Sequence, residues 1–125
     1  MIAPPPFDLE EPGTFVFTAR RAYEGREITR LGQVLRDPEV RARFVEDERG
    51  FLAGFDLTET DRSALAARDW TTLLSRGGHL QAVVKIASVL GESIWDVGAH
   101  SVGCTREELV AACPRVVSAV PRAGA

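Results

Sequence analysis

The chain has 125 residues, 45% of them hydrophobic, and carries a formal net charge of −3 at pH 7. Such a chain is long enough to bury the core of one domain without disulfides or a metal. Its mildly acidic charge argues against nucleic-acid binding, and no stretch predicts a membrane span or an export signal. The two cysteines, Cys104 and Cys113, are therefore expected to be reduced thiols in a cytoplasmic protein.

The pattern along the chain predicts one domain with an extension at each end. Residues 1–13 contain three consecutive prolines, and because proline fixes φ and lacks an N–H, we expect an extended arm there. Residues 14–113 carry the apolar periodicity of a helical domain. Residues 114–125 are small and poor in large apolar groups, so we expect a mobile tail.

The sequence pattern leaves the first segment after the arm ambiguous but predicts the second one clearly. Phe17, Arg21 and Glu24 are spaced like one helical face, although residues 15–17 fit an extended segment equally well. Residues 28–35 repeat large apolar side chains at helical spacing, which predicts a short amphipathic helix.

Cap residues predict where the next helices begin. Asp37-Pro38 places a capping carboxylate before a proline at the first helical position, and the helix should run to about Phe55. Thr58 and Asp61 form a variant of the capping box, which predicts a helix to about Arg68. Asp69 is positioned to cap a further short helix.

The organising element is a helix predicted over residues 79–90. Its polar side chains, Gln81, Lys85 and Ser88, fall on one narrow stripe, and the rest of its circumference is apolar. A helix of this kind needs neighbours on several sides, and it is too short to span a bilayer. We therefore expect it at the centre of the domain.

The last part of the domain predicts two more helical segments. Ser93 can cap a segment that Gly98 should weaken as a regular helix, and Thr105 with Glu108 forms a regular capping box for a helix ending near Ala112. No alternating strand pattern of useful length appears. The predicted fold is all-α, with about six or seven short helices around residues 79–90.

Few residues offer catalytic chemistry. His79, His100 and Asp96 match the two imidazoles and one carboxylate of a non-haem iron site, but the central helix separates His79 from the other two. Cys104 precedes a helix and could pair with His100, although a small packing residue is the simpler interpretation. Residues 75–78 look like a helix end rather than an anion loop. We therefore assign no catalytic and no metal-binding residue, and interpret the chain as a helical binding or regulatory subunit.

The order and spacing of several motifs are more specific than any one of them. The chain resembles the small (alpha) subunit of the protocatechuate 4,5-dioxygenase family of two-subunit extradiol ring-cleavage dioxygenases. The resemblance runs from about Pro12 to Leu109 and rests on five pieces. These pieces are PGTFVFT at residues 12–18, the block from Phe44 to Leu57, LAARD at residues 65–69, Gly77-Gly78, and Gly103 with TREE at residues 105–108.

This resemblance implies a division of labour between two subunits. In the family, a large (beta) subunit holds Fe(II) through two histidines and a carboxylate, binds the catechol and cleaves its ring. The small subunit binds no cofactor and covers the active-site mouth. A cover of this kind would exclude water and shape the substrate pocket, which agrees with the few catalytic residues here.

The resemblance also implies which residues face the partner. The stretch after the central helix approaches the substrate pocket in the family, so Ile94, Trp95 and His100 are the expected lining residues. Phe15, Phe17 and Trp95 are the expected contacts with the large subunit. An aliphatic Ile94 stands where protocatechuate enzymes tend to carry an aromatic residue, which leaves catechol, gallate-like and aminophenol substrates open.

Two other classes of function stay open from the sequence. Related domains serve as recognition domains of precursor peptides for backbone N-methyltransferases, although those domains tend to be shorter than this chain. A free-standing enzyme that uses the histidines and cysteines is the other alternative. The neighbouring gene would distinguish the first alternative, and assays with and without added iron would distinguish the second.

Overall fold

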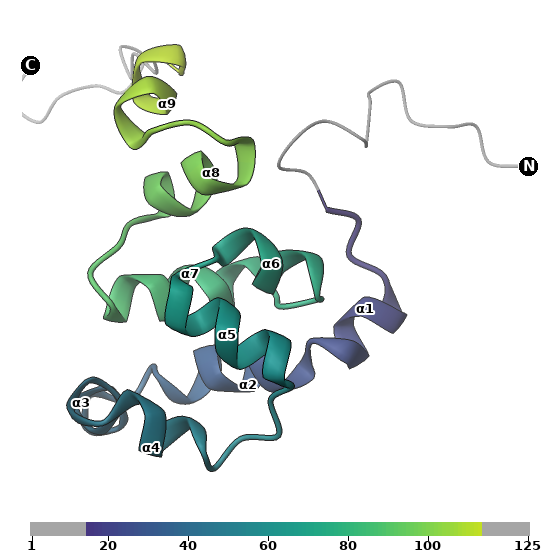
Figure 1. Ribbon diagram of the computed structural model, residues 1–125, viewed down its shortest axis with the longest axis vertical. Coiled ribbons are helices and arrows are strands. Elements are labelled where there is room, and N and C mark those ends of the chain that lie inside the picture. The colour runs from purple at the N-terminus through teal and green to yellow at the C-terminus, as the bar shows by residue number, and fades with distance from the viewer. Residues whose placement is uncertain (1–14, 114–125) are drawn as a thin grey trace, which may run out of the picture.

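The computed structural model describes residues 15–113, and every regular element within this range is an α-helix. The predicted all-α class is therefore confirmed, whereas the predicted arm (residues 1–13) and tail (residues 114–125) lie outside the described residues. Figure 1 shows α3 and α4 at one end of the domain, and α8 and α9 at the other. The helices are α1 (Ala19–Glu24), α2 (Arg26–Val34), α3 (Pro38–Glu46), α4 (Glu48–Leu52), α5 (Glu59–Ala67), α6 (Trp70–Ser75), α7 (Leu80–Val89), α8 (Ile94–Val102) and α9 (Arg106–Ala112).

The helices between residues 15 and 113 number nine, rather than the predicted six or seven. One reason is Asp47, which divides the single helix predicted from Pro38 to Phe55. Its backbone leaves the helical region, with φ −143° and ψ 80°, while its side chain accepts a hydrogen bond from the Gly50 N–H. A residue that leaves the helical conformation and caps the next turn ends one helix and begins another.

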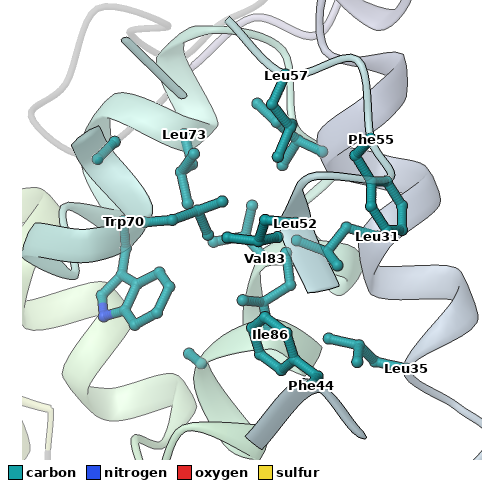
Figure 2. Packing of buried hydrophobic residues seen from close by; sticks show 14 of the residues in the cluster. Leu31, Leu35, Phe44, Leu52, Phe55, Leu57, Trp70, Leu73, Val83 and Ile86 are labelled. Carbon is teal, nitrogen blue, oxygen red and sulfur yellow. The ribbon is translucent and has the colours of Figure 1, made fainter. Parts of the chain in front are cut away.

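The predicted central helix is confirmed as α7, with His79 as its N-cap and Leu90 as its C-cap. Figure 2 shows Val83 and Ile86 of this helix pointing into the core, where Leu31 and Phe44 also lie. Both α7 side chains are completely buried. Burial of each such side chain contributes about 1.5–3 kcal/mol, so contacts of this kind provide most of the stability of a domain built from short helices.

Helix α2 supplies the other half of this core. Ile28, Leu31 and Leu35 recur at helical spacing and are all buried, which confirms the amphipathic pattern. Gly32 on the same helix lies directly against Ala82 of α7. A Cβ atom at Gly32 would come within 2.5 Å of the Ala82 Cα atom, so the two backbones approach more closely than any larger residue would permit.

Helix α7 is not covered on every side. Gln81 and Ser88 of the predicted polar stripe are exposed and Lys85 is half-buried, as the pattern indicated. However, Leu80 is 53% exposed, so the expectation that neighbours cover the whole apolar circumference is wrong at this position. Leu80 is the first residue of α7, directly after the His79 cap.

The turn before α7 depends on its two glycines. Gly77 adopts φ +97°, a conformation that costs glycine little, and the Gly78 N–H donates to the Leu73 carbonyl oxygen at 3.0 Å. The preceding Arg76 forms an ion pair with the buried carboxylate of Asp61. Residues 75–78 are therefore a helix end, as predicted, and their arginine is already paired within the chain.

The last two helices correct two local predictions. Residues 94–102 form a regular helix despite Gly98, because Ser93 and Asp96 complete a reciprocal capping box at its start. Thr105 does cap α9 by accepting from the Glu108 N–H at 3.1 Å. The reciprocal bond of a full capping box is replaced by one from the Thr105 hydroxyl to the Glu108 carboxylate.

Candidate functional site

The two histidines belong to different parts of the fold. His79 caps α7, because its Nδ1 atom accepts a hydrogen bond from the Gln81 N–H at 3.2 Å. Its ring also packs edge-on against Phe17, with 5.5 Å between the ring centroids. The Thr29 hydroxyl accepts from the His79 backbone N–H at 3.1 Å, which ties this position to α2. His79 therefore has a structural role at the junction of α2 and α7.

His100 lies in the last turn of α8 and contacts the start of α6. Its Nδ1 atom is 2.5 Å from the Thr71 hydroxyl oxygen, and its Nε2 atom is 3.8 Å from a carboxylate oxygen of Asp69. The pKa of Asp69 is lowered, first by the hydrogen bond from the Thr72 hydroxyl and to a lesser degree by His100. Asp69 and Thr71 are thus the partners of His100, although they are about thirty positions away in the sequence.

His100 and Asp96 lie four residues apart on α8, but no hydrogen bond among the described residues joins their side chains. Asp96 instead accepts a hydrogen bond from the Ser93 N–H at 2.7 Å, as part of the cap of α8. This contact is the largest cause of the lowered pKa of the Asp96 carboxyl. The capping preference of an aspartate three residues after a serine could have been read from the sequence.

No group of three His, Cys, Asp or Glu side chains within residues 15–113 is placed to hold a metal ion. His79, His100 and Asp96 each have a separate partner, so this part of the chain does not fit the iron set considered from the sequence. Cys104 is half-buried and Cys113 is exposed, and both are free thiols. No hydrogen bond among the described residues joins Cys104 to His100, so the packing interpretation of Cys104 is favoured.

The first turn of α8 presents two large apolar side chains to solvent. Ile94 is 59% exposed and Trp95 is 38% exposed, while Val97 and Ala99 of the same helix are buried. The Ser93 cap and these buried residues fix the orientation of the turn. His100 lies about 140° around the helix from Trp95, on the side facing α6. The structure therefore groups Ile94 with Trp95 and separates both from His100.

A second apolar surface lies beside the start of α7. Phe15, Phe17, Leu74 and Leu80 line a small hollow of about 230 Å³ together with His79. Phe17 is 51% exposed, and residues 15–18 lie outside α1, which contains Arg21 and Glu24 and is preceded by the extended backbone of Thr18. The assignment of Phe15, Phe17 and Trp95 to a partner contact stays a prediction, as does the lining role of Ile94, Trp95 and His100.

Comparison with known proteins agrees with an all-helical subunit of a ring-opening enzyme. The sequence profile of the family described as "Aromatic-ring-opening dioxygenase LigAB, LigA subunit" matches residues 28–113, more than half of the chain. The chain therefore belongs to this family of small dioxygenase subunits, which confirms the resemblance seen in the motifs.

A curated relative supports the same class. The chain is 26% identical over 98 residues to a gallate dioxygenase of Pseudomonas putida (strain KT2440). The match covers 78% of this chain and 29% of that protein, so this chain spans less than a third of the relative's length. Separately, none of the helices between residues 15 and 113 is long and apolar enough to cross a membrane.

Proposed function

We propose that this chain is the small (alpha) subunit of a two-subunit extradiol ring-cleavage dioxygenase and covers the active site of a larger catalytic subunit. The observation that carries the proposal is the match of residues 28–113 to the small-subunit family. The described residues offer no metal-ligand set, and they leave large apolar side chains exposed on α8 and near α7. Such side chains are typical of a surface that a partner buries.

The relative supports a role beside a larger catalytic part. Its name states that it is a gallate dioxygenase, and the region matching this chain makes up 29% of its length. A module that accompanies a longer polypeptide in one protein can act as a separate subunit in another. We therefore propose a hetero-oligomer in the cytoplasm, in which the large (beta) subunit binds Fe(II) and this chain binds no cofactor.

The first turn of α8 is the proposed wall of the substrate pocket. Ile94 and Trp95 are apolar, exposed and held on a capped helix, so they can close over an aromatic ring and exclude water. His100 is kept as a third lining candidate, and its bond to Thr71 would hold the ring in place. We propose a catechol-type substrate at the subunit interface, with gallate-like compounds and aminophenols as the classes to compare.

The test is purification of the tagged full chain from its native host. The expected result is a larger partner that contains iron, in a complex that cleaves a catechol beside its diol. Recovery of a methyltransferase instead would contradict the proposal and favour the precursor-peptide alternative. Recovery of the chain alone, with ring-cleavage activity of its own, would favour the free-standing enzyme.

Two substitutions distinguish a specific interface at Trp95 from non-specific hydrophobic association. Trp95→Ala should weaken the complex, because a large aromatic at the centre of an interface is a typical hot spot. Val45→Ala is the matched control, since Val45 is 60% exposed on α3, at the far end of the domain from α8 (Figure 1). Equal weakening by both variants would contradict the assignment of Trp95 to the interface.

A further inference from the structure

A groove runs between α2 and α7, and His79 lines both this groove and the hollow described beside the start of α7. Its volume is about 520 Å³, within the size range of small-molecule sites. Thr29, Gly32 and Arg36 line it from the side of α2, and His79, Ala82 and Lys85 line it from the side of α7. Thr29 and Gly32 lie one turn apart on α2, and Ala82 and Lys85 lie one turn apart on α7. Arg36 follows the end of α2, and His79 caps the start of α7.

Three pairs of residues define the direction of the groove. Thr29 bonds the backbone of His79, and Gly32 lies against Ala82, so the two helices advance together from their N-terminal ends. One turn further on, Arg36 and Lys85 line the same groove. Gly32 and Ala82 form an apolar part of the groove lining, because neither residue has a side chain larger than a methyl group.

The charge of the groove is opposite to that of the whole chain. No carboxylate lines the groove, although the chain carries a net charge of −3. Lys85 is the single lysine of the sequence, and it is half-buried. Neither Lys85 nor Arg36 forms an ion pair with any acidic residue between 15 and 113.

A second hollow next to the groove adds another positively charged side chain near Lys85. This hollow, on the other side of Lys85, contains Arg41 of α3 and is also free of carboxylates among its lining residues. Arg36 donates from Nε to the Gln33 carbonyl oxygen at 3.2 Å, which restrains its guanidinium group at the groove. The remaining N–H groups of an arginine suit the two oxygens of a carboxylate, and a lysine adds a point charge.

We propose that this groove binds a small organic carboxylate. Arg36 and Lys85 bind the carboxylate group, and the apolar body of the ligand lies over Gly32 and Ala82. The volume exceeds that of a simple inorganic ion, and Gly32 and Ala82 offer an apolar surface that such an ion would not use. This site does not depend on the proposed function. None of the residues that line the groove is among those expected to line the dioxygenase pocket, which are Ile94, Trp95 and His100.

The test is to titrate the isotope-labelled full chain with benzoate and with glutarate, and to record the amide NMR spectrum at each ligand concentration. We expect saturable one-to-one binding, with the largest shifts at the amides of Thr29, Gly32, Ala82 and Lys85. Benzamide, which has the shape of benzoate without its charge, should not bind measurably. Largest shifts elsewhere, no saturation, or equal binding of benzamide would overturn the proposal. Inorganic phosphate binding as tightly as both carboxylates would overturn the assignment to an organic ligand.

Substitutions then test the two cations. Arg36→Gln and Lys85→Gln should each weaken benzoate binding by roughly tenfold or more, as expected for loss of a hydrogen bond to a charged group. Arg43→Gln is the matched control, because this substitution removes the same charge. Arg43 is exposed on α3 and lines neither the groove nor the neighbouring hollow. Equal weakening by Arg43→Gln would show that only overall charge matters and would overturn the site. The amide spectrum of each variant shows whether it is folded, and the shift map of the unsubstituted chain tests the site without any variant.

Discussion

At the scale of single residues, Glu27 connects two segments that are distant in sequence. Its carboxylate accepts hydrogen bonds from Arg30 at 2.6 Å and 3.0 Å, and from the backbone N–H of Asp56 at 3.0 Å. These contacts lower the pKa of Glu27 from 4.5 to about 2, with the Arg30 hydrogen bond as the largest cause. Glu27 thus fixes the loop before α5 onto α2, in addition to favouring the N-terminus of α2 as an acidic residue.

We expect Glu27→Gln to destabilise the fold at pH 7 by about 1 kcal/mol, since solvent screens the half-exposed Arg30. A lowered pKa means that the stabilisation is present above the ordinary pKa and is lost as the pH falls through the folded-state pKa. The difference between the two proteins should therefore shrink between pH 4.5 and about 2. Urea unfolding at several pH values measures it.

The control for this prediction is Glu24→Gln. Glu24 forms an exposed pair with Arg20 one turn away, and pairs of this kind contribute little. A difference between Glu27→Gln and the unsubstituted chain that is the same at pH 7 and pH 2 would show that ionisation of Glu27 is not the cause.

At the scale of elements, the domain depends on the packing of α2 against α7. The contact requires Gly32, because a side chain there would collide with the backbone of Ala82. Around this contact, Leu31, Leu35, Val83 and Ile86 are completely buried (Figure 2). The helices are short and would not be stable in isolation, so this shared core determines whether they form.

We expect Ile86→Ala to reduce the free energy of unfolding by about 2–5 kcal/mol, through lost burial and the cavity that remains. Ser88→Ala on the exposed side of the same helix should change it by less than about 0.5 kcal/mol. Denaturant unfolding of the full chain measures both. Similar losses in the two variants would mean that the buried and exposed faces of α7 are assigned incorrectly.

At the scale of the whole molecule, the part of the chain from residue 15 to 113 combines exposed apolar surfaces with no group of three potential metal ligands. Exposed apolar side chains lie in the first turn of α8 and beside the start of α7, as well as at Tyr23 and Val45, and both histidines and several acidic side chains are used in caps and pairs. These apolar surfaces suit the covering role proposed above, in which the partner would carry out the chemistry and the cover would exclude water.

We expect the purified chain to contain no stoichiometric iron and to cleave no catechol, because the described residues offer no set of three metal ligands. Metal analysis and an oxygen-uptake assay check both statements. Stoichiometric iron that disappears in a His79→Ala or His100→Ala variant would contradict the covering role.

Within the proposed complex, Ile94→Ala should alter substrate choice without changing the iron requirement. Truncation of an apolar wall typically changes discrimination by about 1–3 kcal/mol, so we expect a higher KM for the native catechol and a gain for bulkier ring substituents. Steady-state ring cleavage with several catechols measures this, alongside the affinity of the subunits. An unchanged kcat/KM for every catechol, with normal subunit affinity, would show that Ile94 does not line the pocket.

The sequence by itself determined the helical class, the starts of most helices and the central position of residues 79–90. These features depend on residues within one or two turns of each other. Helix caps and apolar periodicity can therefore be recognised from the local order of residues. The order of motifs also identified the family, later shown by the match to residues 28–113.

Only the tertiary structure decided which distant residues meet. It placed His100 against Thr71 and Asp69, about thirty positions away, and it left Leu80 exposed despite its apolar helix. It also brought Arg36 and Lys85 to one groove, because Gly32 allows two helices about fifty positions apart to pack closely. Such pairings depend on how elements are arranged in space, and local periodicity specifies the face of a helix but not the neighbour that the face meets.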